Sequence, residues 1–382
     1  MSILNIFGIL TLIILFLGFH VACEINGQTG KPNKSALSTS SQYDEGKQQF
    51  KNPVSLNMDL TGSVPSMVAE YFQRKTTRVP KTKLPEIKPD FDKFLEASED
   101  AKFIWLGHST FLVNMGGQTI LVDPVFESYA SPFPILVKRF QAPVVSVADL
   151  PNIDVIVISH DHYDHLEKET IKKFVGSETK MIVPLGVGAH LKKWGVSPSQ
   201  IVELDWWEST IHGPTTFTAT PAQHFSGRGF IRNETLWAGW SMKSSTASVF
   251  YSGDSGYGDH YKEIGEKLGP FDLTFIENGQ YNKHWRNVHQ FPEEAIQAHL
   301  DVKGKAMVPV HWGMFELSTH SWFEPINRSH DEALRKGVRL FTPKIGQTVR
   351  LNQPNVFDRW WPEGEDSLAL EFIPSEKYAS NR

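Results

Sequence analysis

Residues 155–165 read VIVISHDHYDH, a short apolar β-type run that leads directly into three histidines and two aspartates. In an extended chain, residues two apart project to the same side, so His160 and His162 can point at one ion, and Asp164 and His165 follow as the chain turns. Packing alone does not call for so many imidazoles and carboxylates in six residues. Four candidate ligands exceed what one tetrahedral site with an open position needs. The stretch therefore predicts two metal ions.

Three further candidate ligands also lie where an apparent β-strand ends. Residues 217–223 lead into His224, residues 248–253 into Asp254, and residues 306–310 into His311. Strand ends hold catalytic groups rigidly, so we expect four strand ends to deliver all ligands to one edge of the sheets. With Asp254 as the bridge, the two predicted sets are His160, His162 and His224 for one ion, and Asp164, His165 and His311 for the other.

Alternative interpretations exist for the isolated candidates. A single histidine beside an aromatic residue, as His224 or His311 is, occurs more often in a core or on a surface than as a ligand. Asp254 lies in Ser-Gly-Asp-Ser-Gly, a composition that favours a turn, and both roles can hold at once. We interpret His108, His190, His212, His260 and His330 as ordinary histidines, with His108 a possible neighbour of the ligands.

Composition narrows the class of protein. With 382 residues, of which 40% are hydrophobic and 12% aromatic, the chain can bury a large core. The net charge of −5 contains no basic stripe, so we expect no nucleic-acid partner. The single cysteine, Cys23, excludes a disulfide framework and a cysteine-based zinc site. Any metal must therefore be held by histidine and carboxylate.

The N-terminus has the composition of a targeting segment. Residues 3–23 are almost uninterruptedly apolar, which indicates a secretory signal with a lipoprotein-type cleavage site, after which Cys23 carries acyl chains. An uncleaved membrane anchor and a plain cleaved signal are the alternatives, and all three export the catalytic part. Residues 24–57 are polar and predict a flexible tether. Residues 58–382 are expected to form the catalytic domain.

Short β-type runs and helical stretches alternate along that domain. Strands are expected near residues 103–106, 110–114, 119–122 and 155–158, with a turn at Gly116-Gly117. Helices are expected at 167–174, 187–194, 261–268 and 293–300, where apolar residues recur at three- and four-residue spacing. This pattern predicts an α/β fold in which two mixed sheets face each other and helices lie outside.

Several motifs resemble the zinc-dependent N-acyl-phosphatidylethanolamine-hydrolysing phospholipase D family, a branch of the metallo-β-lactamase superfamily. The run from Ser159 to Leu166 is similar to the superfamily signature. The narrower motifs are Trp105-Leu106-Gly107-His108-Ser109-Thr110, Val122-Asp123-Pro124, Glu203-Leu204-Asp205-Trp206-Trp207-Glu208, Gly253-Asp254-Ser255-Gly256-Tyr257, Pro292-Glu293-Glu294-Ala295 and His311-Trp312-Gly313. The resemblance covers about residues 102–350. It implies an αββα sandwich, the same seven ligands for two Zn²⁺, and His289 as a histidine that faces the substrate phosphate.

The chemistry that follows is phosphodiester hydrolysis. Two ions that share a water lower its pKa and hold it as hydroxide, so no protein nucleophile is needed. Attack on phosphorus releases an N-acylethanolamine and leaves phosphatidic acid. Asp254 bridges the ions, and His289 positions the phosphate or protonates the leaving group, although it could also be an ordinary loop histidine. Asp123 is expected to orient a ligand imidazole.

The partners that this hypothesis requires are a phospholipid and a membrane surface, and the family resemblance suggests a homodimer. Residues 132–140 are apolar and then basic, which suits contact with acyl chains and headgroups, or alternatively a packed loop with Lys138 and Arg139 in solvent. The competing functions are an exported binuclear metallohydrolase acting on another phosphodiester or a lactone, and a non-enzymatic metal-binding lipoprotein. Iron or manganese could replace zinc in a site made of histidine and aspartate.

Overall fold

A seven-stranded mixed sheet forms one half of the domain. In this computed structural model, which describes residues 28–55, 77–133, 136–229 and 231–362, the N-terminal strands of the sheet are antiparallel and the later ones parallel. Gly116 and Gly117, both with positive φ, form the tight turn between the third and fourth strands in spatial order, as predicted. The spatial order is β15 (Thr348–Arg350), β3 (Lys102–Trp105), β4 (Phe111–Met115), β5 (Gln118–Val122), β6 (Val155–Val157), β7 (Lys180–Pro184) and β8 (Ile201–Leu204).

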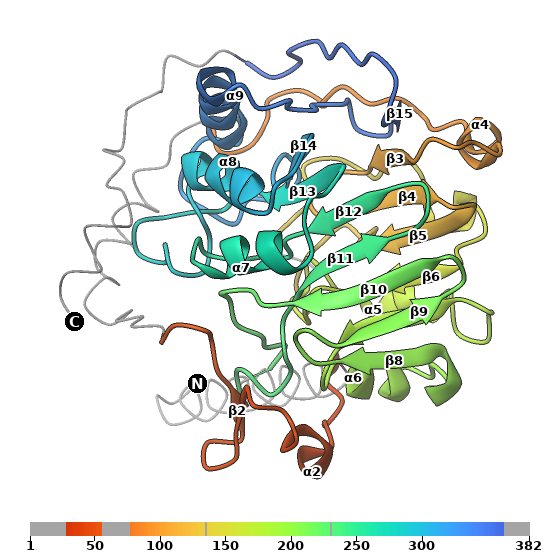
Figure 1. The fold of residues 1–382 in the computed structure, drawn as a ribbon, viewed down its shortest axis with the longest axis vertical. Coiled ribbons are helices and arrows are strands. Elements are labelled where there is room, and N and C mark those ends of the chain that lie inside the picture. Colours follow the sequence, from red (N-terminus) through yellow and green to blue (C-terminus); the bar gives the residue numbers. More distant parts are fainter. Residues whose placement is uncertain (1–27, 56–76, 134–135, 230, 363–382) are drawn as a thin grey trace, which may run out of the picture.

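A six-stranded mixed sheet forms the other half (Figure 1). Its order is β14 (Met307–Val310), β13 (Leu273–Glu277), β12 (Ser248–Tyr251), β11 (Gly239–Lys243), β10 (Thr215–Thr220) and β9 (Ser209–His212). The first three strands in this order are parallel, and the others pair antiparallel. Side chains of both sheets form one apolar cluster, in which the rings of Phe111 and Phe275 stack at 3.8 Å.

Helices cover the outer face of each sheet. Alternate residues of the seven-stranded sheet, such as Ile104 and Ile156, pack with Ile171 and Leu191 of two helices. On the six-stranded sheet, Phe250 and Ile276 pack in the same way with three other helices. The two helices are α5 (Lys168–Lys172) and α6 (Gly188–Lys193), and the three are α7 (His260–Lys267), α8 (Pro292–Asp301) and α9 (Glu324–Lys336). The predicted sandwich with helices outside is confirmed.

Shorter elements complete the described part of the domain. They are α4 (Phe91–Leu95) and the 3₁₀ helices η1 (Val147–Asp149) and η2 (Pro198–Gln200). The predicted strands and helices agree with the observed ones to within about two residues at each end, which is the ordinary uncertainty of an element boundary.

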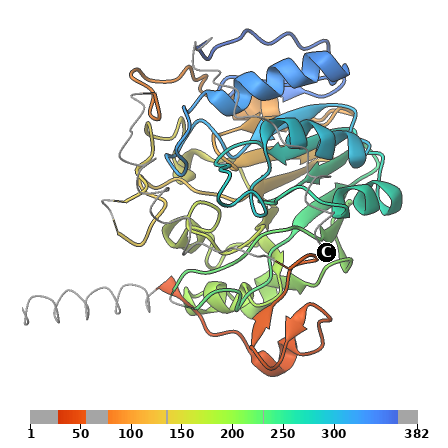
Figure 2. The same cartoon turned by 90° about the vertical axis from the view of Figure 1, so that its left-hand side faces the viewer.

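Over residues 28–55 the structure differs from the flexible tether that we expected for residues 24–57. This segment contains α2 (Lys34–Leu37), β1 (Tyr43–Asp44) and β2 (Gln49–Phe50), and it lies against the lower end of the domain (Figure 2). Three of its large apolar side chains, Leu37, Tyr43 and Phe50, are buried in the main apolar cluster, whereas Val54 is exposed. The average composition is that of a tether, but these few residues suffice to dock it.

Two predictions about membrane contact meet the structure only in part. The predicted targeting segment, residues 1–23, lies outside the described residues, and within the described ones no helix is long and apolar enough to cross a bilayer. In residues 132–140, Lys138 is exposed, but the Arg139 guanidinium is buried and donates to the carbonyls of Val125 and Glu127. Arg139 is therefore neither solvated nor available to a lipid headgroup, because its guanidinium group is hydrogen-bonded to backbone carbonyls inside the fold.

Candidate metal centre

The structure brings all seven predicted ligands together at one edge of the sandwich. His160, His162, Asp164 and His165 follow β6, His224 follows β10, Asp254 follows β12 and His311 follows β14. His311 has a φ of 66°, so the chain reverses sharply as it leaves the strand. Parallel and antiparallel strands that end at the same edge deliver their following residues to one place, which is why these positions converge.

The first group consists of three imidazoles. His160 Nε2 lies 2.8 Å from His162 Nδ1, and His224 Nε2 lies 3.3 Å from the same atom. Burial and the neighbouring histidines lower the pKa of His160 well below its usual range, and burial lowers that of His224 in the same way. Three neutral imidazoles that point their nitrogens at a common point have the arrangement of ligands to one divalent cation.

The second group consists of Asp164, His165 and His311. Asp164 Oδ2 lies 3.4 Å from His165 Nε2 and 3.3 Å from His311 Nε2. Burial would raise the pKa of Asp164, but its histidine neighbours outweigh burial and hold the pKa well below the usual range. Asp164 is therefore an ionised carboxylate that is largely shielded from solvent, which suits it to a cation.

Asp254 lies between the two groups. Its Oδ2 is within 4.0 Å of the Nε2 atoms of four histidines: 3.9 Å from His160, 3.1 Å from His165, 3.7 Å from His224 and 3.0 Å from His311. Its other oxygen, Oδ1, is buried and has no hydrogen-bond partner among the described residues. An ionised carboxylate oxygen is costly to bury in this way unless a cation accompanies it. The donor set and this orphan atom fit a pair of divalent cations that share Asp254.

Asp123 orients one of the ligands, as predicted. It follows β5 with a φ of 39°, and its Oδ2 accepts hydrogen bonds from His165 Nδ1 at 2.7 Å and from the Tyr251 hydroxyl at 2.6 Å. The same carboxylate accepts from the backbone amide and the hydroxyl of Ser159. This network fixes the His165 ring so that Nε2 faces the site.

Glu277 and His289 form a buried pair beside the seven residues. His289 Nδ1 lies 2.5 Å from Glu277 Oε1, and a ring nitrogen of His289 lies within 4.8 Å of ligand atoms of His224 and Asp254. Burial and the charge of Asp254 raise the pKa of Glu277 well above its usual range, and burial lowers that of His289 to about 4. His289 is thus neutral and held at the site, whereas Glu277 was not anticipated from the sequence because it is simply the last residue of a buried strand.

His108 is a second residue that the sequence reasoning underrated. Its Nε2 lies 2.9 Å from Asp164 Oδ2, its ring lies 4.3 Å from that of His311, and burial lowers its pKa to about 3. It could hold a metal together with Asp164, His165 and His311, or orient Asp164. The positive φ of 52° that turns His108 into the site has no sequence signature, but its place in the Trp105–Thr110 motif was a usable signal.

Asp161 points away from the ligands that flank it. Its carboxylate accepts hydrogen bonds from the amide of Gly227 at 2.7 Å and the hydroxyl of Thr235 at 3.0 Å, and it lies 3.1 Å from His190 Nε2. Burial would raise the pKa of Asp161, but the bond to His190 and nearby charges lower it. Asp161 therefore anchors the loop that carries His160 and His162, and His190 is part of this support.

Comparisons with known families and sequences place this chain in a superfamily. Residues 118–312 match the family model described as β-lactamase superfamily domain. A protein of Mycobacterium tuberculosis is 45% identical over 262 residues, which cover 67% of this chain and 70% of that protein. The N-acyl-phosphatidylethanolamine-hydrolysing phospholipase D 1 of Caenorhabditis elegans is 37% identical over 238 residues, covering 57% of this chain and 65% of that protein.

A comparison with solved structures finds a hydrolase with a similar fold. The isothiocyanate hydrolase from Delia radicum gut bacteria superimposes with a TM-score of 0.52 at 17% identity, over 65% of this chain and 98% of that chain. At this identity the likeness concerns the fold alone.

Proposed function

We propose, from the premise that this chain belongs to the β-lactamase superfamily and is a metal-dependent hydrolase, that it is a zinc phosphodiesterase of the phospholipase D type. Its proposed substrate is N-acyl-phosphatidylethanolamine, and its products are an N-acylethanolamine and phosphatidic acid. The carrying observation is that seven candidate ligands converge, with Asp254 between two groups of three, and have a neutral histidine, His289, beside them. The 37% identity to the nematode phospholipase D supports the choice of lipid.

In this proposal one zinc ion is held by His160, His162 and His224, and the other by Asp164, His165 and His311, with Asp254 between them. When bound, such a pair of cations acidifies a shared water and neutralises charge on phosphoryl oxygens. The protein supplies the rest: Asp123 holds the His165 ring, and Asp161 anchors the loop between His160 and His162.

His289 has the role of orienting the phosphodiester. Glu277 occupies its Nδ1, so Nε2 is the nitrogen that remains for a substrate. The raised pKa of Glu277 and the lowered pKa of His289 place the shared proton on the carboxyl side, which leaves a proton on Nε2. An Nε2–H can donate to a phosphoryl oxygen and pass its proton to the departing alkoxide, while Glu277 replaces the proton at Nδ1.

The decisive experiment is a lipid-class screen with the zinc-loaded full chain and mass spectrometry of the products. We expect release of N-acylethanolamine from N-acyl-phosphatidylethanolamine, and its loss in His162→Ala and Asp254→Ala. Hydrolysis of soluble phosphodiesters or lactones without action on the lipid would contradict the substrate and favour the second enzymatic function. Zinc binding without any measurable turnover would favour a metal-binding protein.

We also propose that the enzyme is exported and works at a membrane surface, to which residues 1–23 attach it. The support is the apolar composition of that segment and Cys23 at its end. Fractionation of cells that express the full chain and Cys23→Ser separates the possibilities. Acylation through Cys23 predicts that the variant leaves the membrane fraction, and an uncleaved anchor predicts that it stays.

A further inference from the structure

We infer that residues 28–55, here called the N-terminal strap, position the three histidines of the first metal group. The strap contacts His224 directly, and it reaches the loop that carries His160 and His162 through His190. The inference rests on the proposed metal-dependent function, since it concerns how the chain holds one of the two ions. It also assigns a role to a segment whose composition is that of a linker.

Asn52 makes the contact between the strap and His224. Its side-chain amide donates to the carbonyl of His224 at 2.6 Å, and its side-chain oxygen accepts from the amide of His224 at 2.8 Å. The preceding residue, Gln223, exchanges a matching pair of hydrogen bonds with the backbone of Val54, at 2.7 and 3.2 Å. Two hydrogen bonds from Asn52 thus fix the backbone of His224, and two more tie the side chain of the preceding residue to the strap.

Gly30 makes the second contact of the strap, with His190. Its amide donates to His190 Nδ1 at 2.8 Å, and the opposite nitrogen of that ring, Nε2, lies 3.1 Å from Asp161 Oδ2. A Cβ on Gly30 would lie 1.9 Å from the carbonyl oxygen of Ala189, so the strap can approach α6 this closely only with glycine. Asp161 stands between His160 and His162 in the chain, so this relay reaches the other two histidines of the first group.

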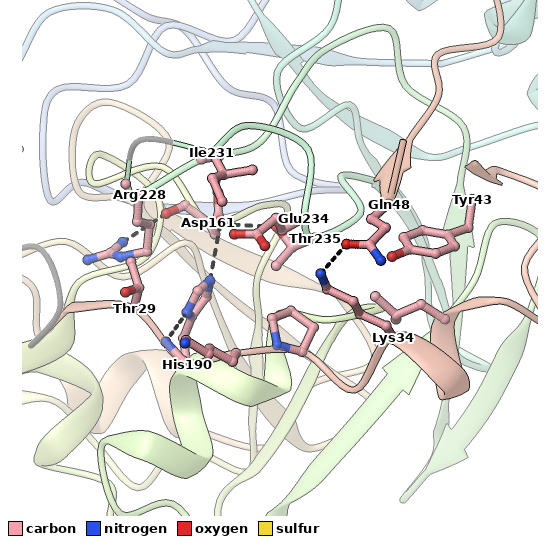
Figure 3. A pocket seen from close by; sticks show the side chains of 16 residues that line it. Thr29, Lys34, Tyr43, Gln48, Asp161, His190, Arg228, Ile231, Glu234 and Thr235 are labelled. Carbon is pink, nitrogen blue, oxygen red and sulfur yellow. Dashed lines mark hydrogen bonds and ion pairs between the residues drawn. The ribbon is translucent and has the colours of Figure 1, made fainter. Parts of the chain in front are cut away.

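Between these two places the strap spans a cavity of about 510 Å³ (Figure 3). Thr29, Lys34, Tyr43 and Gln48 line it from the strap, and Asp161 and His190 line it from the domain, with the bond between the latter two visible in the figure. Leu37 and Tyr43 of the strap line the same cavity and pack into the core cluster, so packing docks the strap here while Asn52 and Gly30 connect it to the first group. The contacts of Asn52 and Gly30 reach the first group, whereas Asp123 and Tyr251 hold His165 of the second group from inside the sandwich.

The strap therefore predicts a selective effect on one ion. Asn52→Ala removes two hydrogen bonds to the His224 backbone and leaves the surroundings of the second group unchanged. Residues that support a metal ligand from outside typically account for at least about a 10-fold difference in metal affinity. We expect Asn52→Ala to lower the affinity of one zinc ion by about 10-fold. The matched control is Asn33→Ala, which removes an asparagine of the same strap that caps α2.

The test measures zinc equivalents per chain in full-length protein dialysed against buffered free zinc. Wild type and Asn33→Ala should each bind two equivalents with the same two affinities. Asn52→Ala should bind one equivalent normally and the other about 10-fold more weakly. Equal zinc curves for Asn52→Ala and wild type would overturn the inference, as would an equal weakening of both ions. If wild type itself binds fewer than two equivalents, the proposed binuclear function fails instead.

Double variants identify which ion is affected. Combined with His162→Ala, which removes a ligand of the first group, Asn52→Ala should have no additional effect on the remaining ion. Combined with Asp164→Ala, it should still weaken the remaining ion by about 10-fold. The reverse pattern would assign the strap to the second group and refute the inference.

A second substitution separates positioning from a general loss of folding. Asn52→Asp keeps an acceptor for the His224 amide but sets a carboxylate oxygen against the His224 carbonyl, where two acceptors meet, so its zinc affinity should be no higher than that of Asn52→Ala. Thermal unfolding of the metal-free proteins completes the test. If the zinc affinities of the variants follow their metal-free melting temperatures rather than the hydrogen bonds they retain, the strap is merely structural and the inference is wrong.

Discussion

Substituting Asp123 by asparagine tests whether one buried carboxylate organises the second half of the metal centre. Oδ2 of Asp123 accepts from three donors, Ser159 Oγ, His165 Nδ1 and Tyr251 OH, and Oδ1 accepts from the amide of Ser159. The best placement of an asparagine amide keeps its oxygen at the Oδ2 position. Its NH₂ group then faces the Ser159 amide, and two donors meet.

The expected cost follows from this count. Losing one charge-assisted hydrogen bond and leaving a buried donor unsatisfied costs about 2 kcal/mol. Removing the charge weakens the three remaining bonds, which adds about 1 kcal/mol. The total of about 3 kcal/mol corresponds to a fall of roughly 4 °C in the melting temperature for a chain of this size. Because the hydrogen bond that orients His165 weakens, zinc affinity should also fall by about 10- to 100-fold.

The assay is thermal unfolding of the metal-free protein, followed by zinc titration. Asp259→Asn is the matched control, because it makes the same chemical change at a fully exposed carboxylate and should leave both quantities unchanged. If metal-free Asp123→Asn melts within about 1 °C of wild type, the network does not carry the stability that its geometry implies. Normal zinc affinity in that variant would refute the orienting role of Asp123.

Three further predictions concern leaving groups, metal and pH. His289→Ala should lower hydrolysis of the lipid by about 10²- to 10⁴-fold. It should lower hydrolysis of bis(4-nitrophenyl) phosphate much less, because that leaving group needs no proton and only the orienting contact is lost; equal losses on both substrates would exclude proton donation. Zinc at about 100 times its dissociation constant should stabilise the metal-free protein by about 2.7 kcal/mol per ion in calorimetry, and an unchanged melting temperature would contradict the metal site. Burial lowers the pKa of His299 to about 4 from an unfolded value of about 6.5. The unfolded state therefore takes up the proton first as the pH falls. This difference should lower metal-free stability by about 3 kcal/mol between pH 6.5 and 4. Urea titrations at both pH values should show a smaller fall in His299→Asn.

His108, which was underrated, and Glu277, which was missed, were hard to identify for a common physical reason. His108 enters the site through a positive φ, and Glu277 through its position at the end of a strand whose five residues are all buried. Neither a positive φ nor a position at a strand end can be recognised from residue types and their spacing in the sequence. A buried glutamate at a strand end becomes recognisable only when the loop carrying His289 is seen to return to it.

The sequence by itself determined the layered fold, the turn at Gly116-Gly117 and the cluster of candidate ligands, because strand periodicity, turn residues and the run from His160 to His165 are local patterns. Only the tertiary structure decided the role of residues 28–55. Gly30 meets His190 across 160 positions of sequence, and Asn52 meets His224 across 172. The composition of these residues is that of a linker, but a few buried side chains and hydrogen bonds dock them, and such long-range contacts leave no periodicity in the chain.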